Sequence, residues 1–305
     1  MATNSRPLHT FELVEHFLVN ALEIEINKKN YHIVPKIVTT ELNIENFDLK
    51  QITLQSKAYR NIYHRQDQER LNLKKRIVGE LLTKKRLMND DDIRLGKGGA
   101  IPNGPNFKQD SNAYIVIGLP ASGKSGISNQ IADETQSIIL DSDYAKRKLP
   151  EFDSLPFGAS LVHGESNEIV FGEAKSDYDS VFDVAVKYKI NIVIPKIGNN
   201  FDSIHQLIKL LKKFDYNVHI TLVELDRKKA TIRALNRFLK TKRYVPLALI
   251  FDSYSNNPSL TFYRAISEIP LEITSYGMIS TDVKLGEKPI VKFYNNDNPA
   301  KIYKV

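Results

Sequence analysis

The sequence contains no cysteine, which excludes disulfide bonds and metal sites built from thiolates. It has no apolar run near the roughly 20 residues that a membrane-spanning helix needs, and residues 1–6 lack the apolar core of a secretory signal. Glycine and proline are not enriched, and no repeat or low-complexity segment is visible. We therefore expect a folded cytoplasmic protein without a membrane anchor. Delivery into a host cell by a dedicated secretion machine is compatible with these features.

Acidic residues are fewer than basic ones: 36 Asp and Glu stand against 43 Lys and Arg, which gives a formal charge of +7. Such an excess favours anionic partners, among them nucleotides, nucleic acids and acidic surfaces. No recognisable nucleic-acid-binding motif accompanies the charge, so we do not expect nucleic acid as the partner. A kinase acting on nucleic-acid ends stays open as an alternative, which a steep salt dependence of binding would reveal.

A glycine-rich stretch at residues 118–125, Gly-Leu-Pro-Ala-Ser-Gly-Lys-Ser, matches the phosphate-loop pattern G-x-x-x-x-G-K-[ST]. The apolar run before it predicts a buried strand, and residues 126–134 predict a helix. In this context backbone N–H groups surround the phosphates, the lysine reaches the β and γ phosphates, and the serine hydroxyl binds Mg²⁺. We therefore expect a nucleoside triphosphate, held by Gly118, Ala121, Ser122, Gly123, Lys124, Ser125 and Gly126.

From residue 114 onward, predicted strands alternate with predicted helices. This alternation is typical of a parallel sheet with helices on both faces, so we expect an α/β fold of the P-loop kinase type. Past residue 263 the pattern changes to short strands at 271–276 and 289–294, which indicate an antiparallel edge. The predicted strands are 114–118, 137–141, 191–195 and 217–224, and the predicted helices lie near 125–134, 165–188, 202–214, 227–240 and 246–254.

The N-terminal third has a different character. Thr10 is a plausible N-cap for a helix reaching to about residue 27, and residues 55–88 combine both charge signs with helical apolar spacing. Residues 95–106 hold four glycines and two prolines, which mark a loop or linker. We therefore divide the chain into a mainly helical N-terminal region with its linker, residues 1–106, and a kinase-type domain, residues 107–305.

Two carboxylates follow the second predicted strand, in Asp141-Ser142-Asp143. In an open parallel sheet, ligands bind beyond the carboxyl ends of the strands, so both acids are expected to face the phosphate loop. One can complete the Mg²⁺ shell while the other orients or deprotonates an acceptor hydroxyl. The same tripeptide could instead cap the following turn.

Phosphoryl transfer requires positive charge over the transferring group. Arg233, Arg237 and Arg243 lie on and just after the predicted helix that begins near Arg227. We favour Arg237 and Arg243 as clamps on the transition state, although any one of these arginines could belong to a solvated helix face.

Three more residues are candidates for substrate binding. Lys196 follows the third predicted strand and places a cation at the carboxyl edge of the sheet, where a substrate phosphate or the nucleotide could meet it. His163 and Glu165 stand at the start of a long predicted helix, a natural position for polar substrate contacts. Glu165 could equally serve as a helix-capping residue.

Over residues 114–246 the chain resembles zeta-toxin-family kinases. The resemblance rests on the phosphate loop, on Asp-Glu-Thr-Gln at residues 133–136, on Asp141-Ser142-Asp143 with Lys146 after it, and on Pro-Glu-Phe-Asp at residues 150–153. It implies an ATP-dependent kinase with Mg²⁺ in which Asp143 is the catalytic base. The other acid, Asp141, is then left for the metal. It also implies that arginines after the fourth strand contact the triphosphate.

The chain departs from the toxin members of that family at two positions. Their Glu at the end of the third strand is replaced by Pro195-Lys196, and their His before the Pro-x-Phe block is Leu149. The phosphate loop, His-Gly-Glu-Ser at 163–166, Ile-Pro-Lys-Ile-Gly at 194–198 and Arg237-Phe238 with Arg-Tyr-Val-Pro at 243–246 are more similar to the branch that contains a bacterial plant-pathogen effector.

This branch resemblance implies a substrate class. The effector phosphorylates NAD at the 3′-hydroxyl of its adenosine ribose, whereas toxin members phosphorylate UDP-N-acetylglucosamine at its 3′-hydroxyl. We expect a toxin or effector kinase for a nucleotide-like small molecule, with NAD first and a UDP-sugar second. The resemblance also suggests an antitoxin-like or chaperone-like protein partner. A nucleotide-binding switch without turnover stays open as an alternative.

Overall fold

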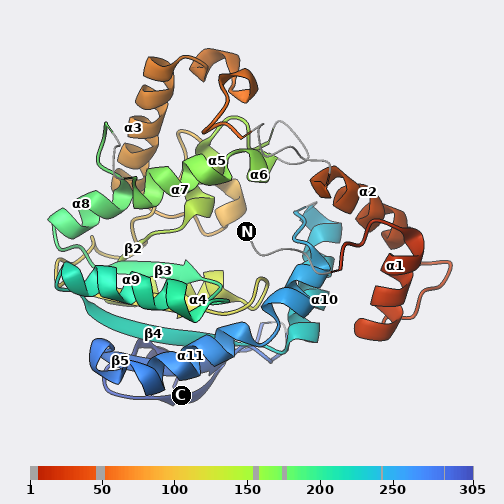
Figure 1. Cartoon of the computed structure of the whole chain (residues 1–305). Coiled ribbons are helices and arrows are strands. Elements are labelled where there is room, and N and C mark those ends of the chain that lie inside the picture. The colour runs from red at the N-terminus through yellow and green to blue at the C-terminus, as the bar shows by residue number, and fades with distance from the viewer. Residues whose placement is uncertain are drawn as a thin grey trace.

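The computed structural model describes residues 6–45, 52–153, 158–173, 177–241, 243–284 and 286–304. A six-stranded sheet with the order β2-β3-β1-β4-β5-β6 forms its centre (Figure 1). The first five strands run parallel, and β6 is antiparallel to β5. None of the helices within the described residues has the length and apolar character to cross a membrane. The strands are β1 Asn112–Ile117, β2 Ile138–Ile139, β3 Ile192–Lys196, β4 Asn217–Glu224, β5 Ser275–Ser280 and β6 Ile290–Tyr294.

Helices surround this sheet. Figure 1 shows α3, α5, α7 and α8 gathered beyond the edge formed by β2 and β3, and α1 and α2 beside α10. The helices are α1 Phe11–His16, α2 Ile33–Glu45, α3 Asp67–Thr83, α4 Lys124–Thr135, α5 Ser142–Lys148, α6 Gly158–Leu161, α7 His163–Phe171, α8 Val181–Lys187, α9 Phe201–Lys213, α10 Arg227–Thr241 and α11 Asn257–Glu268.

The central strands explain why the sheet is covered. Residues 113–117 of β1 are all buried, and Ile115 pairs with Ile194 of β3 on one side and Ile220 of β4 on the other. A strand that is apolar on both faces requires helices on both faces. Helix α4 packs against β1, β2 and β3, while α9 and α11 pack against β4. The predicted α/β fold of the P-loop kinase type is confirmed.

The predicted helix 165–188 is wrong in one respect, because the structure contains two helices, α7 and α8, in this stretch. Gly172 ends α7 with a φ of 78°, a positive value that glycine adopts without strain. A Cβ at this position would lie 3.1 Å from Ser180 Oγ. Ser180 then starts α8, since its hydroxyl accepts a hydrogen bond from Asp183 N at 3.1 Å.

Two more element predictions need correction. Thr10 does cap a helix, accepting from Leu13 N at 3.3 Å, but α1 continues only as a π-helix over Phe17–Ala21 and does not reach residue 27. The predicted strand 271–276 begins in a 3₁₀ turn, Pro270–Glu272, and only its last two residues belong to β5, which runs parallel to β4. The antiparallel edge begins only with β6, because β5 still lies inside the parallel sheet.

Helix α2 was not expected because its sequence is rich in β-branched residues, which are poor helix formers. It nevertheless places Ile33, Val34, Ile37 and Val38 on one buried face, at the spacing of an amphipathic helix. These residues belong to a hydrophobic cluster that also contains residues of α1 and α10. Tertiary burial therefore outweighs local propensity in this segment.

Helix α3 joins the core of the sheet. Its Leu73, Ile77 and Leu81 are buried in the same hydrophobic cluster as the residues of β1, β3 and β4. After α3, the carbonyl of Ala100 accepts a hydrogen bond from Ile139 N of β2 at 3.1 Å. The division at residue 106 stays a prediction, but the described core continues across it.

Candidate active site

The phosphate loop lies between the carboxyl end of β1 and the start of α4. Gly118 approaches β4 so closely that a Cβ would lie 2.5 Å from the carbonyl oxygen of Val223. Ala121 and Gly123 have φ values of 60° and 89°, in the left-handed region. Gly123 is the N-cap of α4 and provides no side chain for capping. The first-turn N–H groups of α4 are therefore left for an anion.

Lys124 lies within this loop. Its Nζ donates to the carbonyls of Gly118 and Leu119, both at 2.6 Å. Burial lowers the pKa of Lys124 to about 7, although the nearby Asp141 carboxylate acts in the opposite direction. Lys124 has no carboxylate ion pair among the described residues, and such a half-buried ammonium gains most when a phosphate approaches.

The other loop residues also fit a phosphate. Ser125 and Gly126 are exposed in the first turn of α4. Ser122 is fully buried and, within the described part of the chain, its hydroxyl has no hydrogen-bond partner. Its carbonyl accepts from Thr281 Oγ1 at 2.6 Å, which ties the loop to the residue that follows β5. The structure thus brings together all the predicted loop residues.

Asp141 and Asp143 follow β2 and face different surroundings. Asp141 caps α5, because its Oδ1 accepts from Asp143 N at 2.9 Å, so the capping role foreseen for this tripeptide is real. Burial, followed by the charge of Asp143, raises the pKa of Asp141 to about 6. Burial would also raise the pKa of Asp143, but Lys146 and Arg243 hold it well below its usual range. Asp143 is therefore the more firmly ionised of the two.

The partners of Asp143 come from two directions. Lys146, one helical turn later, donates to Oδ1 at 2.9 Å, and Arg243 donates to Oδ2 at 2.9 Å. Arg237 on α10 lies near Asp143 as well, since Arg243, Asp143 and Lys124 all interact electrostatically with it. Its buried Nε has no partner among the described residues. The structure therefore brings both predicted clamp arginines to Asp143, and Arg237 also to Lys124 of the phosphate loop.

Arg233 does not belong to this group. It donates to the carbonyl of Thr281 at 2.8 Å and so supports the chain after β5. Its place on α10 is one turn before Arg237, which explains why sequence spacing alone could not separate their roles.

Two residues that were not predicted lie beside the acids. Arg147 on α5 donates to Asp91 Oδ1 at 2.8 Å, and Arg243 donates to the same oxygen at 3.0 Å. In the sequence, Arg147 stands in the basic run Lys146-Arg147-Lys148, and the pattern alone does not separate the roles of the three residues. In the structure they have different partners, and Lys148 donates to Glu80 Oε2 at 2.8 Å. Asp91 comes from the N-terminal region and has no local signal of a site residue.

Lys196 and His163 also lie near the two acids, Asp141 and Asp143. Lys196 ends β3, with its Nζ 4.0 Å from the centre of the Phe171 ring. Burial lowers the pKa of Lys196, and the Asp141 carboxylate opposes that shift. His163 is exposed at the start of α7 and interacts electrostatically with Lys146 and with Asp143. Both residues can meet an acceptor molecule.

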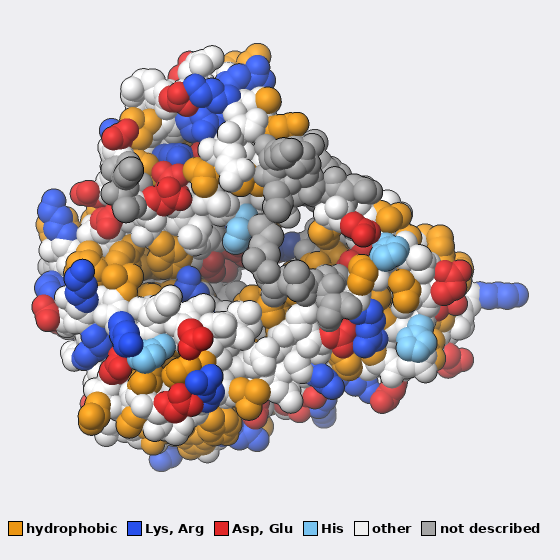
Figure 2. All heavy atoms as spheres, in the orientation of Figure 1, with side chains coloured by type: hydrophobic (Ala, Val, Ile, Leu, Met, Phe, Trp, Pro, Cys, Tyr) orange, Lys and Arg blue, Asp and Glu red, His pale blue; other side chains and the backbone are white. Residues whose placement is uncertain are grey.

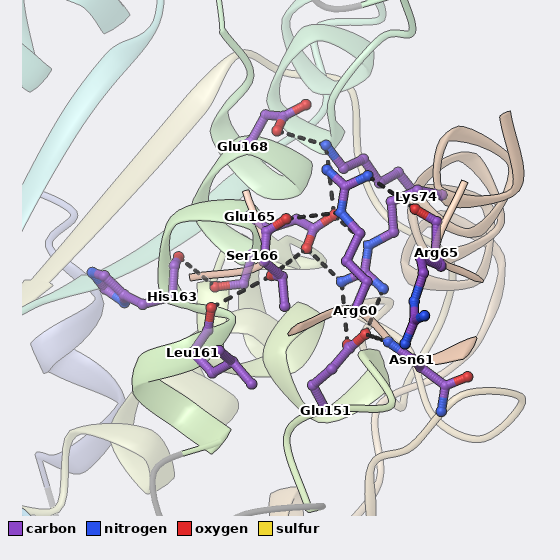
Figure 3. A network of polar contacts seen from close by, with 12 residues as sticks. Arg60, Asn61, Arg65, Lys74, Glu151, Leu161, His163, Glu165, Ser166 and Glu168 are labelled. Carbon is purple, nitrogen blue, oxygen red and sulfur yellow. Dashed lines mark hydrogen bonds and ion pairs between the residues drawn. The ribbon is translucent and has the colours of Figure 1, made fainter. Parts of the chain in front are cut away.

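Glu165 is not brought to this site. Figure 3 shows it turned toward α3, away from the ring of His163. The carboxylate is fully buried and accepts from Arg70 Nε at 2.7 Å and from Thr53 Oγ1 at 2.6 Å. Burial would raise the pKa of Glu165, but the hydrogen bonds and charge of Arg70, together with Lys74 and Thr53, lower it below its usual value. The expected substrate contact is replaced by a structural ion pair, because this face of α7 packs on α3.

The face that carries the site is concave. Figure 2 shows a hollow between the α5 and α7 side of the molecule and α10, with acidic, basic and histidine side chains around it. The site residues thus combine a phosphate loop, two carboxylates with different ionisation, and several cations. This arrangement can bind a triphosphate and position a hydroxyl group beside it.

Comparisons with known proteins agree with this description. The family model of the Zeta toxin matches residues 103–263, and no curated protein matches. The structure is similar to one from the PezAT chromosomal toxin-antitoxin system of Streptococcus pneumoniae, with 14% identity over 80% of this chain and 89% of that chain, and a TM-score of 0.54. It also matches the AvrRxo1-ORF1:-ORF2 complex, native and with ATP, with 16% and 15% identity over 82% of this chain and 74% of that chain. Their TM-scores are 0.47 and 0.46.

The structure from the PezAT system shares the fold at low identity, whereas the family model covers more than half of the chain. The matched residues include the phosphate loop, both acids and the arginines Arg147, Arg237 and Arg243. The chain therefore belongs to the Zeta toxin family and is an ATP-dependent phosphotransferase.

Proposed function

We propose that this kinase transfers the γ-phosphate of ATP to a ribose or sugar hydroxyl of a nucleotide-like small molecule. The observation that carries the proposal is Asp143, a carboxylate held ionised between Lys146 and Arg243 beside the phosphate loop. Such a group can orient an acceptor hydroxyl toward the γ-phosphate and accept its proton.

NAD is the first candidate acceptor, with its adenosine 3′-hydroxyl as the reacting group, and UDP-N-acetylglucosamine is the second. The support for NAD is the sequence pattern around His163, Lys196, Arg237 and Arg243, together with the cation at position 196. Lys196 has no carboxylate partner among the described residues and rests on the Phe171 ring. An acceptor that carries its own phosphates would supply that partner.

In the proposed reaction, the acceptor hydroxyl oxygen forms a bond to the γ-phosphorus. The bond between that phosphorus and the bridging oxygen to the β-phosphate breaks, ADP leaves, and the hydroxyl proton goes to Asp143. Lys124, Arg237 and Arg243 offset the negative charge of the transferring group. Because the transition state of phosphoryl transfer is loose, Asp143 acts mainly by orienting the hydroxyl, which agrees with its low pKa.

Mg²⁺ fits the loop end of the site. The described residues contain no cluster of three or more His, Asp and Glu side chains that could hold a metal by itself, and Mg²⁺ in kinases is held mostly by substrate phosphates and waters. Ser125 and Asp141 are the residues that would bind it. The ion would neutralise phosphate charge during transfer.

The test is incubation with ATP and Mg²⁺ against NAD, UDP-N-acetylglucosamine and an oligonucleotide, with mass spectrometry of the products. We expect one added phosphate on NAD and none on the oligonucleotide. The Lys124→Ala variant is the control and should form no product, because it lacks the phosphate-binding cation. Phosphorylated oligonucleotide would support a nucleic-acid end kinase, and ATP binding without any product would support a switch.

We also propose that the protein acts as a toxin or effector with an antitoxin-like or chaperone-like partner. The support is its family and its similarity to a structure from a toxin-antitoxin system. Expression of the wild-type chain should arrest growth, whereas Asp143→Asn should not. Equal arrest by both forms would contradict a toxic role for the kinase activity.

A further inference from the structure

We propose that Arg147 and Arg243 form a phosphate subsite and that Asp91 is its built-in competitor. In this proposal a phosphoryl group of a substrate replaces the Asp91 carboxylate between the two guanidinium groups. The inference deepens the proposed function, because it names the charged group through which the site recognises a substrate.

The geometry of Asp91 motivates the proposal. Its Oδ1 receives hydrogen bonds from Arg147 at 2.8 Å and from Arg243 at 3.0 Å. Two guanidinium groups that converge on one anionic oxygen are a common way to bind phosphate. Asp91 belongs to a short 3₁₀ turn, Asp90–Asp92, far from both arginines in the sequence. An acid from the N-terminal region therefore occupies the position that an anionic substrate group would take.

The two partners differ in burial. The side chain of Arg147 is only 4% exposed, whereas that of Asp91 is 43% exposed. The Arg147 guanidinium lies over the Phe152 ring at 5.8 Å, and its buried Nε has no partner among the described residues. The arginine is thus fixed in place, and the carboxylate can leave toward water at little cost.

The charges around this point favour an added anion. Burial and then the positive charge of Arg243 lower the pKa of Arg147. The same two causes, in the same order, lower the pKa of Arg237. Among the described residues, the cationic side chains that interact here outnumber the carboxylates: Lys124, Lys146, Arg147, Arg237 and Arg243 face Asp90, Asp91, Asp141 and Asp143.

Displacement of Asp91 would also affect the reaction. Arg243 bridges Asp91 and Asp143, with hydrogen bonds of 3.0 and 2.9 Å. If a phosphate takes Arg243, the Oδ2 of Asp143 becomes free to accept a hydrogen bond from the substrate hydroxyl. Arg243 would then couple anion binding at the subsite to the availability of Asp143 for the substrate hydroxyl.

The test uses the full chain with Asp91→Asn, which keeps the shape of the side chain and removes its charge. Asp92→Asn is the matched control, since Asp92 is an exposed neighbour in the same turn whose side chain has no hydrogen bond or ion pair in the described structure. Calorimetry at constant ionic strength measures binding of ATP with Mg²⁺, of NAD and of inorganic tripolyphosphate. Thermal unfolding verifies that both variants are folded.

We expect Asp91→Asn to bind one of these probes roughly three- to tenfold more tightly than the wild type, and Asp92→Asn to bind as the wild type does. A gain for ATP and tripolyphosphate assigns the subsite to the donor, and a gain for NAD alone assigns it to the acceptor. Arg147→Gln should weaken the same probe, and the double variant should lose the gain.

Unchanged or weaker binding by a folded Asp91→Asn variant for all three probes would overturn the proposal and make Asp91 a positioning residue for the arginines. If this variant does not fold, Asp91→Ser takes its place in the same measurement. Binding is measured without turnover, so a failure of the subsite proposal can be distinguished from a failure of the proposed acceptor. A tighter ATP complex that phosphorylates neither NAD nor the UDP-sugar would uphold the subsite and reject those acceptors.

Discussion

Asp141 and Asp143 are two residues apart, yet their environments separate their ionisation. Asp141 accepts from a backbone N–H and lies close to the second acid, whereas Asp143 has two cationic partners. Two neighbouring carboxylates whose pKa values shift in opposite directions are a common basis for different catalytic roles. These contacts support the proposed assignment of orientation to Asp143 and of the metal to Asp141.

Asp143→Asn should lower the turnover rate at least about a hundredfold, because it removes the carboxylate that orients the acceptor hydroxyl and accepts its proton, and such groups typically contribute on the order of 10²–10⁴. Its affinity for ATP should stay nearly unchanged, since the lost interaction belongs to the transition state. Asp141→Asn should instead raise the Mg²⁺ concentration needed for half-maximal rate. Rates at saturating ATP and varied Mg²⁺ separate the two. Near-normal turnover of Asp143→Asn, with a loss in Asp141→Asn that Mg²⁺ does not rescue, would reverse the assignment.

At the scale of elements, a buried network of charges fastens α3 to α7 (Figure 3). Arg70 of α3 contacts Glu165 of α7 and also donates to Glu151 at 2.8 Å, and Lys74 donates to Glu168 at 2.8 Å. These side chains are almost completely buried, so each charge depends on its partners. The network holds α7, and with it His163, beside the acids of α5.

Arg70→Met should lower the free energy of unfolding by about 3–5 kcal/mol, because it removes the cation that pairs with two buried carboxylates, Glu151 and Glu165. The control is Arg76→Met on the same helix, whose side chain is 57% exposed in its pair with Glu80 and should cost less than about 1 kcal/mol. Urea unfolding at neutral pH measures both values. Equal values for the two variants would show that the network adds no specific stability.

The same network predicts that the free energy of unfolding depends on pH. The pKa of Glu165 is lowered in the folded state, so its contribution is complete above the unfolded pKa of about 4.3 and is lost as pH falls through the lower folded value. In Arg70→Met the buried Glu165 carboxylate loses the cation that lowers its pKa, so the penalty of the substitution should shrink as pH falls. Urea unfolding at pH 4 and pH 7 compares the two proteins. A penalty that is independent of pH would exclude Glu165 as its source.

At the scale of the whole molecule, the N-terminal region and the sheet share structure. Helix α3 contributes Leu73, Ile77 and Leu81 to the core around the sheet, and Ala100 hydrogen-bonds to β2. The N-terminal turn at Asp90–Asp92 also reaches the site through Asp91. The glycine- and proline-rich stretch at 95–106 therefore lies inside a continuous unit of the described chain.

A truncated chain starting at Phe107 should be insoluble or unfolded, because it exposes the apolar surface under α3 and removes Arg70 from two buried carboxylates. Soluble yield, circular dichroism and thermal unfolding measure this outcome. Co-expression with residues 6–106 as a separate chain is the control and should restore soluble protein. A truncated chain that is soluble and active by itself would establish the boundary at residue 106.

The sequence by itself determined the features that depend on local pattern. The phosphate loop, the strands around it and the paired acids were recognisable because turn geometry, apolar runs and short spacing are local properties. The break at Gly172 was also within reach of such reasoning, since glycine followed by a Ser180 cap is a local signal. The prediction of one continuous helix over residues 165–188 did not take this signal into account.

Only the tertiary structure decided which charges meet. Glu165 pairs with a residue 95 positions away, and Arg243 meets an acid 152 positions away. No local pattern specifies such pairs, because ion pairs between elements depend on how packed helices face one another. Residue type therefore indicated that Glu165 and Arg243 carry chemistry or structure, and only packing assigned the first to the core and the second to the site.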